Sequence, residues 1–258
     1  MWRFFTRIFS IVCVFAIQPD AGFSQTRPKV VVGYASMSTV ATTLWVAQER
    51  GFFAKNGLDV QAIFIPGSPT LIASLNTGDV HFGYTGGTAT LGGAVGGLDI
   101  KMIAAFANHV QTDLVVRPEI KTPADLRGKR IGVTSIVVRS DYLAKQQSIA
   151  RNTLKAMIES HAFVHNHANK AAVIEITSKK LGITDPVAAN DGYEDYLRRT
   201  DRKASISIEG VKNIQRFMKL RNPKIADVNL ERLIDESLLR ELEKSSLVEQ
   251  SPRGETVR

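Results

Sequence analysis

Between residues 29 and 107 the sequence alternates short apolar runs with segments of helical character, and this alternation limits the fold more than any other feature. The apolar runs cover residues 29–34, 58–65, 80–84 and 100–106. The helical segments between them cover residues 38–50, 69–76 and 88–95. Strands at this spacing with helices between them are typical of βαβ crossovers, which build a mostly parallel sheet covered on both faces. We therefore expect an α/β fold in this part of the chain.

Three of the predicted strands end at loops rich in glycine and hydroxyl side chains. These loops are GYASMST (33–39), PGSPT (66–70) and YTGGTAT (84–90). The carboxyl ends of parallel strands meet at one edge of a sheet, which is the usual place for a ligand. Each loop also opens a helix, whose free N–H groups and dipole favour a small anion or a polar ligand. Helix capping alone would explain Ser38, Ser68 or Thr88 in any one loop, but three such loops at one edge favour a binding site.

After residue 140 no strand-like run remains, and apolar residues recur at helical spacing. The three helical faces are Leu154, Met157, Ile158 and His161; Val211, Ile214 and Met218; and Leu230, Leu233, Ile234 and Leu238. This half of the chain is therefore predicted to be helical and to cover one face of the sheet.

The first 24 residues have the layout of a secretory signal peptide. Two arginines precede an apolar run at residues 8–17, and small residues lead to a cleavage site after Ser24. The run has about half of the ~20 residues needed to span a bilayer, so export to the periplasm without a membrane anchor is expected. The single cysteine, Cys13, lies within this segment. Disulfides and thiolate sites are therefore excluded from the mature chain.

Charge and motif content argue against several classes of function. The formal net charge is +8, and removal of residues 1–24, with two arginines and one aspartate, leaves +7. The basic residues are scattered with little aromatic interleaving, so no nucleic-acid partner is expected. No phosphate loop or nucleophile elbow is present, so neither an enzyme nor a cofactor is predicted. His161, His165 and His167 lack a nearby carboxylate or thiolate, so no metal site is predicted there.

Three motifs together resemble one protein family. WVAQERGFFAKNGLDV (45–60) is similar to the first helix, turn and strand of the SsuA-like periplasmic substrate-binding proteins of nitrate-, sulfonate- and taurine-type ABC transporters. LIASLNTGDVHFGYTGG (71–87) resembles the second helix and third strand of that family. IKTPADLRGKRIGVTS (120–135) resembles its hinge and the entry into its second lobe. Residues 137 to about 242 resemble the C-terminal part, in which the chain returns to the first lobe.

The resemblance implies a periplasmic-binding-protein-like (Venus flytrap) fold from which the second lobe is largely missing. In the family, GKRIGVTS is followed by several tens of residues of alternating helix and strand, which this sequence lacks. The implied parts are a signal peptide (1–24), lobe one (25–116 and 137–243), a hinge with the remnant of lobe two (117–136) and a flexible tail (244–258). Lobe one would combine a parallel-rich sheet with a wrap of C-terminal helices.

The resemblance also implies a function, that of an exported solute-binding component of an ABC importer. Its partners would be a permease in the inner membrane and a small anionic or polar solute of the nitrate, sulfonate, taurine or pyrimidine type. The ligand donors carried over by motif position are Ser38, Thr39, Ser68, Thr70, Thr85, Gly86 and Thr88 on lobe one, with Thr134 as the remnant of the opposite jaw. Because lobe two would supply much of the ligand's burial, binding is expected to be weak.

Two alternatives stay open at this point. The first is a degenerate product of the same family that folds but no longer binds a solute. The second is an enzyme similar to the pyrimidine-precursor synthase of this fold, in which the protein supplies a histidine and a lysine that carries pyridoxal phosphate. Export argues against the second alternative.

Overall fold

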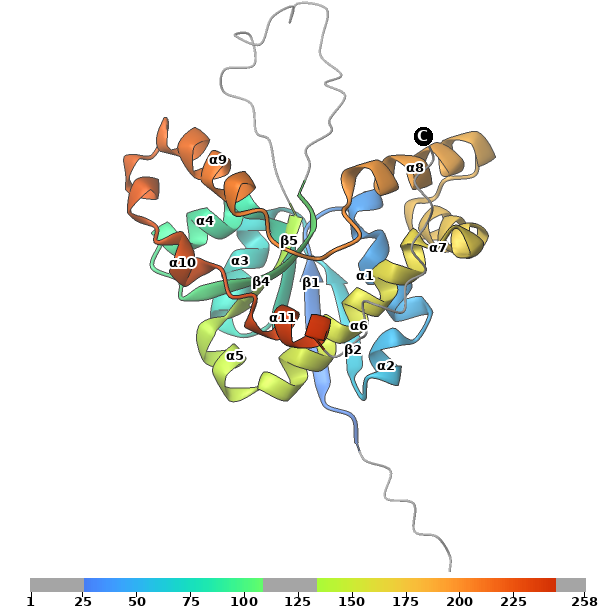
Figure 1. Cartoon of the computed structure of the whole chain (residues 1–258), viewed down its shortest axis with the longest axis horizontal. Helices are drawn as coiled ribbons and strands as arrows, with labels where there is room; N and C mark the ends of the chain where they lie inside the picture. Colours follow the sequence, from blue (N-terminus) through green and yellow to red (C-terminus); the bar gives the residue numbers. More distant parts are fainter. Residues whose placement is uncertain (1–25, 109–133, 245–258) are drawn as a thin grey trace, which may run out of the picture.

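The computed structural model describes residues 26–108 and 134–244, and a five-stranded sheet forms their centre (Figure 1). The strands are β1 (Lys29–Tyr34), β2 (Asp59–Phe64), β3 (Phe82–Gly86), β4 (Ile100–Ala107) and β5 (Thr134–Arg139), in the spatial order β2-β1-β3-β5-β4. β1 runs parallel to β2 and β3, whereas β5 runs antiparallel to its neighbours β3 and β4. The predicted α/β fold is confirmed, and the sheet is mixed because the returning strand opposes the others.

Helices cover both faces of this sheet (Figure 1). One face carries α1 (Thr42–Glu49), α2 (Phe52–Lys55), α6 (Gln147–His165) and α11 (Ser237–Lys244), with α7 (Lys170–Leu181) and α8 (Pro186–Arg199) outside them. The other face carries α3 (Ser68–Thr77), α4 (Gly87–Val95), α9 (Ile208–Lys219), the 3-10 turn η4 (Pro223–Asp227) and α10 (Leu230–Leu233). Three short elements complete the order, η1 (Thr39–Ala41), α5 (Ser140–Lys145) and η3 (His167–Asn169). The result is a three-layer arrangement.

Alternation along the strands supplies the two cores. Ile136 and Val138 of β5 face the core under α1 and α6, whereas Val137 between them faces the core under α3 and α4. Gly33 of β1 lies so close to α3 that a Cβ atom there would come within 2.4 Å of Leu71 Cδ1. α3 can therefore pack directly on β1 at this point only because residue 33 has no side chain.

The chain returns to the sheet as β5 from Thr134, whereas the motifs place the start of the returning part at residue 137. Thr134 already pairs with Gly86 of β3 and Ala107 of β4. Residues 134–136, which the sequence assigns to the remnant of lobe two, therefore lie in the central five-stranded sheet. The expected signal peptide, residues 109–133 with most of the hinge, and the tail after Lys244 lie outside the described residues.

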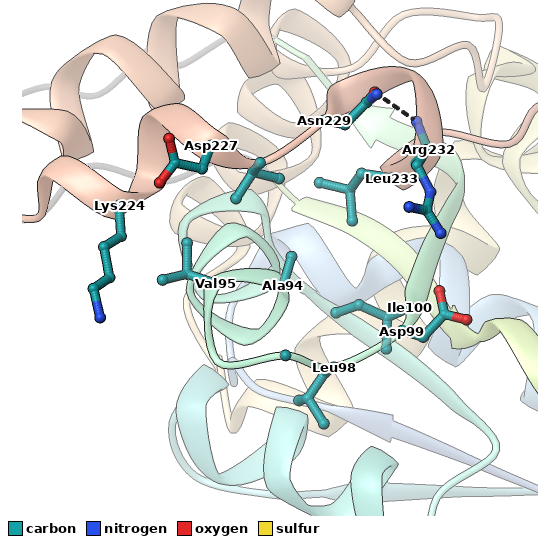
Figure 2. Close-up of a pocket in the computed structure, with 12 residues that line it drawn as sticks. Ala94, Val95, Leu98, Asp99, Ile100, Lys224, Asp227, Asn229, Arg232 and Leu233 are labelled. Carbon is teal, nitrogen blue, oxygen red and sulfur yellow. Dashed lines mark hydrogen bonds between the residues drawn. The ribbon is translucent and has the colours of Figure 1, made fainter.

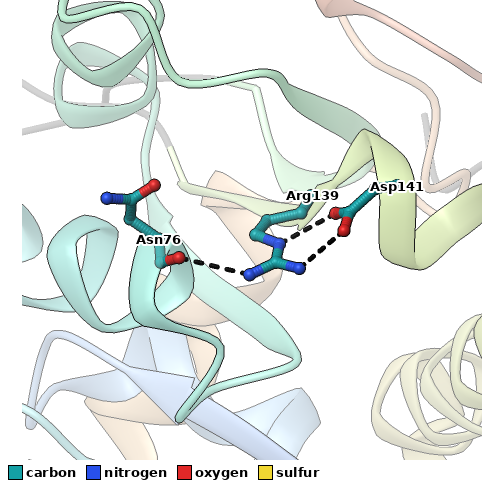
Figure 3. A network of polar contacts seen from close by, with 3 residues as sticks. All are labelled: Asn76, Arg139 and Asp141. Atoms are coloured by element: carbon teal, nitrogen blue, oxygen red, sulfur yellow. Dashed lines mark hydrogen bonds and ion pairs between the residues drawn. The ribbon is translucent and has the colours of Figure 1, made fainter.

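Arg139 at the end of β5 fixes the direction in which the chain leaves the sheet (Figure 3). Its Nε and Nη2 donate to the two carboxylate oxygens of Asp141 at 2.8 and 2.7 Å, and its Nη1 donates to the carbonyl oxygen of Asn76 at 3.2 Å. The guanidinium lowers the pKa of the Asp141 carboxyl through these hydrogen bonds. The guanidinium group of Arg139 thus joins the last turn of α3 to the first turn of α5.

The last predicted helical face is interrupted in the structure. Leu230 and Leu233 lie on α10 and Leu238 lies on α11, but Ile234 between them forms a parallel β-bridge with Met102 of β4. The backbone N–H of Asp235 also donates to the carbonyl oxygen of Met102 at 2.9 Å. A continuous helix was the wrong expectation here because hydrogen bonds to the sheet replace those of a helical turn.

Candidate functional site

A cavity of about 210 Å³ opens at the carboxyl edge of the sheet. Its lining residues are Ala35, Ser36, Val40, Ala41, Ser68, Tyr84, Thr85, Gly86, Thr88 and Thr134. They come from the loop after β1, from the start of α3, from the junction of β3 with α4 and from the start of β5. This is the edge at which ligands bind in open α/β sheets. We call it the edge pocket.

Two helices begin at the edge pocket. α3 begins at Ser68 after Gly67, and α4 begins at Gly87 after Gly86. The positive φ of 89° at Gly67 is a conformation that favours glycine, and it turns the chain from β2 into α3. The first N–H groups of each helix have no partner within the helix, and each dipole places about half a positive charge there. Both features favour an anion or a hydrogen-bond acceptor in the pocket.

Thr85 lines the edge pocket and carries a buried, unsatisfied hydroxyl. Its side chain is buried, with 2% of its surface exposed, and its Oγ1 has no hydrogen-bond partner among the described residues. Its backbone is engaged, because its carbonyl oxygen accepts a hydrogen bond from Ser135 Oγ at 3.4 Å. A buried hydroxyl without a partner costs free energy, so a native protein tends to retain one where something else completes the bond.

The edge pocket carries no formal charge. Its one titratable lining residue is Tyr84, whose hydroxyl donates to the carbonyl oxygen of Val40 at 3.0 Å. Burial raises the pKa of Tyr84, so this phenol stays neutral. No lining residue can act as a strong acid, base or nucleophile at neutral pH. The pocket therefore suits recognition by hydrogen bonds and helix dipoles, and it has no group suited to proton transfer.

The structure brings five of the eight residues predicted from the motifs to the edge pocket, namely Ser68, Thr85, Gly86, Thr88 and Thr134. The other three do not line it. Ser38 Oγ exchanges a hydrogen bond of 2.9 Å with Ser36 Oγ, and Thr70 is exposed on α3. Thr39 faces α8, since a Cβ atom on Gly192 would be 3.4 Å from Thr39 Cγ2.

One assignment is corrected and one lining residue was missed. Thr134 does reach the pocket, but as the first residue of β5 in the central sheet and not as part of an opposite jaw. Ser36 lines the pocket although only its neighbours were selected from the sequence. The signal was present, because Ser36 lies within the same hydroxyl-rich loop after β1.

A larger cavity of about 530 Å³ lies between the loop after α4 and the η4–α10 segment (Figure 2). Its charged residues have both signs, Asp99 and Asp227 against Lys224 and Arg232. Two of its polar groups already serve the fold, since Asp99 Oδ1 accepts from Ser140 Oγ at 2.6 Å and Asn229 Oδ1 accepts from the backbone N–H of Arg232 at 3.1 Å. It lies at the amino end of β4, away from the N-termini of α3 and α4, and is the weaker candidate for a solute site.

The histidines of α6 lie in a buried polar cluster, which consists of Thr43, His161, His165, Tyr196 and Thr200. His161 Nε2 lies 2.6 Å from the carbonyl oxygen of Asp201, so it carries the proton, and Nδ1 accepts from a hydroxyl group. The hydroxyls of Thr43 and Tyr196 both lie 3.1 Å from this Nδ1. His165 Nε2 lies 3.0 Å from Thr200 Oγ1, which in turn donates to the carbonyl oxygen of Tyr196 at 2.8 Å.

Burial keeps both of these histidines neutral. Loss of solvation lowers the pKa of His161 to about 4 and that of His165 to about 3. Neutral imidazoles can bind metals, but here both nitrogens of His161 and the Nε2 of His165 are engaged with protein groups. Within residues 26–108 and 134–244 no group of three histidine, cysteine, aspartate or glutamate side chains is arranged to hold a metal ion.

Comparison with known proteins agrees with the motifs. The family model described as NMT1/THI5 like matches residues 38–138, which is less than half of the chain. A putative binding protein of Brucella abortus (strain 2308) is 31% identical over 115 residues, which cover 45% of this chain and 35% of that protein. The chain thus matches about a third of the length of this curated relative.

Solved structures share the fold. A protein from Bordetella bronchiseptica RB50 superposes with a TM-score of 0.71 at 12% identity, over 84% of this chain and 97% of that one. The periplasmic nitrate-binding protein NrtA from Synechocystis PCC 6803 superposes with a TM-score of 0.56 at 13% identity, over 88% of this chain and 92% of NrtA. The fold is therefore periplasmic-binding-protein-like, and the predicted resemblance to the periplasmic substrate-binding proteins is confirmed.

Proposed function

We propose that this chain is the exported solute-binding component of an ABC importer and that it holds a small anion or polar solute in the edge pocket. The observation that carries this proposal is the buried, unpaired hydroxyl of Thr85 beside the N-termini of α3 and α4. A solute that accepts a hydrogen bond would satisfy Thr85 Oγ1. Free helix N–H groups and the hydroxyls of Ser68 and Thr88 are available for its other acceptor atoms.

The size and charge of the pocket restrict the solute. A volume of about 210 Å³ is below the range of ~300–1,000 Å³ that is typical for drug-sized ligands. Since no cationic side chain lines the pocket, the two helix dipoles would provide the compensation for a negative charge. A single small oxyanion group, such as nitrate or the sulfonate of a short alkane, fits this description.

Affinity is expected to be low, because the described residues form one lobe. Closure of two jaws removes water from a ligand and strengthens each hydrogen bond. If the second jaw supplied two hydrogen bonds to a charged ligand, at ~1.5–3 kcal/mol each, its loss would weaken binding by roughly a thousandfold. A solute that a two-lobed relative binds at micromolar concentration would then bind here at millimolar concentration.

Titration calorimetry tests the proposal with nitrate, taurine, short alkanesulfonates and pyrimidines. We expect millimolar binding of at least one of them, and a loss of about tenfold in the Thr85→Val variant, since one hydrogen bond is removed. Thr70→Val is the matched control, because Thr70 lies near the start of α3 but is exposed and does not line the pocket.

Two results would contradict the proposal. Absence of binding by every solute would favour the degenerate product, and equal affinities for the wild-type chain and Thr85→Val would place the solute elsewhere. Low-micromolar affinity for any of them would show that one lobe suffices and would refute the estimate of weak binding.

The synthase-like enzyme receives no support from the edge pocket. That reading requires a lysine to carry pyridoxal phosphate and a histidine beside it, and neither residue lines the pocket. The residues present therefore do not fit the cofactor. Incubation with pyridoxal phosphate is expected to give no imine absorbance band that depends on the native fold.

Export and the permease partner remain part of the same proposal. The signal-peptide layout of residues 1–24 supports export. In residues 26–108 and 134–244 no helix has the length and apolar character required to cross a membrane. The periplasmic binding proteins of the same fold support a location beside an inner-membrane permease.

A further inference from the structure

α9 and the turn after it carry an exposed surface that the edge pocket does not use. We call it the α9 surface and define it by the apolar residues Phe217 and Leu220 with the basic residues Lys212, Arg216, Lys219, Arg221 and Lys224. Phe217 is 46% exposed and Leu220 is 83% exposed, the largest exposure among the large apolar side chains that the structure describes. All five basic residues are also exposed.

The α9 surface is separate from the face by which the helix packs. Val211 is buried, and Ile214 and Met218 pack on the core formed with α3 and α4. Leu220 follows Val211 by nine residues, or about two and a half helical turns, and so lies on the opposite side. α9 lies at the outer end of the molecule, far from α7 and α8 (Figure 1). The surface therefore faces away from the core.

The charge of this surface is strongly one-sided. Residues 208–224 contain five basic residues and one acidic residue, Glu209, which gives a net charge of +4. Glu209 Oε1 pairs with Arg216 Nη1 at 3.0 Å. Among the described residues no carboxylate oxygen lies within 4.0 Å of a side-chain nitrogen of the other four basic residues. Four cations without an ion pair to a described carboxylate thus share α9 and the turn after it with two exposed apolar side chains.

We propose that the α9 surface docks on an anionic lipid bilayer. An amphipathic helix with apolar side chains between lysines and arginines lies in the plane of a membrane interface, where it buries its apolar tips among the acyl chains. Its basic side chains then contact anionic headgroups, and their long stems follow the apolar boundary. An acidic protein surface would match the charge, but it would not explain the two exposed apolar side chains that accompany the basic residues.

A local reporter tests the proposal in the full chain, whose apolar N-terminal segment can itself bind lipid. Phe217→Trp places a fluorophore on the α9 surface, and Val187→Trp places one on another exposed apolar position, on α8. We expect vesicles of phosphatidylcholine mixed with phosphatidylglycerol to shift the emission of Trp at 217 to shorter wavelength. Pure phosphatidylcholine vesicles and the reporter at 187 should show no such shift.

Charge variants provide the second measurement. Lys219→Glu with Arg221→Glu should weaken the vesicle affinity read from Trp at 217 by at least about tenfold, because each charge near an anionic surface contributes about fivefold. Lys179→Glu with Lys203→Glu changes the net charge by the same amount at exposed positions elsewhere. This pair should change the vesicle affinity by less than about twofold.

Three results would overturn the proposal. They are an unchanged emission of Trp at 217 with anionic vesicles, an equal shift with neutral vesicles, and an equal loss of affinity in the two charge-reversal pairs. The first would leave an acidic protein surface as the partner to examine. None of these results bears on the edge pocket, so the solute proposal and the membrane proposal can fail separately.

Discussion

The edge pocket and the cluster around His161 are both buried and polar, and they differ in how their hydroxyl groups are used. In the cluster, Thr43, Tyr196 and Thr200 all bond to another side chain or to the backbone. In the edge pocket the buried hydroxyl of Thr85 bonds to nothing that the structure describes. Thr43 and Thr85 are both buried, with 0% and 2% of their surfaces exposed. Burial therefore does not distinguish the two regions, but hydrogen bonding does.

This difference separates a polar region that stabilises the fold from one that is suited to a ligand. The cluster joins α1, α6 and α8 by bonds that unfolding would break. The edge pocket retains unused donors at two helix N-termini and at Thr85, which a solute could complete. Trp45 Nε1 and Thr153 Oγ1 also have no partner among the described residues, but neither lines the edge pocket.

The largest expected effect is acid destabilisation through the cluster. The pKa of His161 is about 4 in the folded chain against 6.5 for the free side chain, so the unfolded state binds more protons between these values. Stability should be fully present above pH 6.5 and fall as the pH drops towards 4. The loss from His161 alone is about 3 kcal/mol, and His165 adds to it. Urea unfolding from pH 7 to pH 4 measures this, and a flat profile would contradict the neutral, buried histidines.

A smaller effect is expected from Tyr196→Phe, which removes one hydroxyl from the cluster and leaves the ring in place. The hydroxyl bonds to His161 Nδ1 and to Thr43 Oγ1, so its loss should cost about 1–2 kcal/mol in the free energy of unfolding. Tyr142→Phe is the matched control, because no hydrogen bond of the Tyr142 hydroxyl is found among the described residues. Equal unfolding free energies for the two variants would refute the structural role of the cluster.

The smallest effect on stability is expected where the hydroxyl is unpaired. Thr85→Val removes a buried hydroxyl that bonds to nothing in the described chain, so the free energy of unfolding should change by less than ~0.5 kcal/mol or rise slightly. Thr43→Val makes the same substitution at a paired hydroxyl and should cost about 1–2 kcal/mol. Chemical denaturation of both variants compares the two regions directly. A larger loss for Thr85→Val than for Thr43→Val would reverse the comparison.

The local parts of this structure could be predicted from the sequence. The strands and helices of residues 29–107 follow from alternating periodicity, and the hydroxyl-rich loops indicated the edge at which the pocket forms. The interruption at Ile234 could not be predicted, because it depends on pairing with Met102, more than a hundred residues away. From the sequence, His161 was recognised as one position of a helical face and was rejected as a metal ligand. Its partners Thr43, Tyr196 and Asp201 come from three other segments, and nothing local to α6 identifies them.

Backbone amide chemical shifts, followed during a titration with nitrate and short alkanesulfonates, test the central claim most directly. The claim is that a solute binds at the carboxyl edge of the sheet, with its acceptor atoms at the start of α4 and at Thr85. We predict saturable shifts that are largest at Gly86, Gly87 and Thr88, with millimolar half-saturation that rises by about tenfold in Thr85→Val. Shifts confined to the cavity between Leu98 and Arg232, or shifts that persist unchanged in Thr85→Val, would contradict the account.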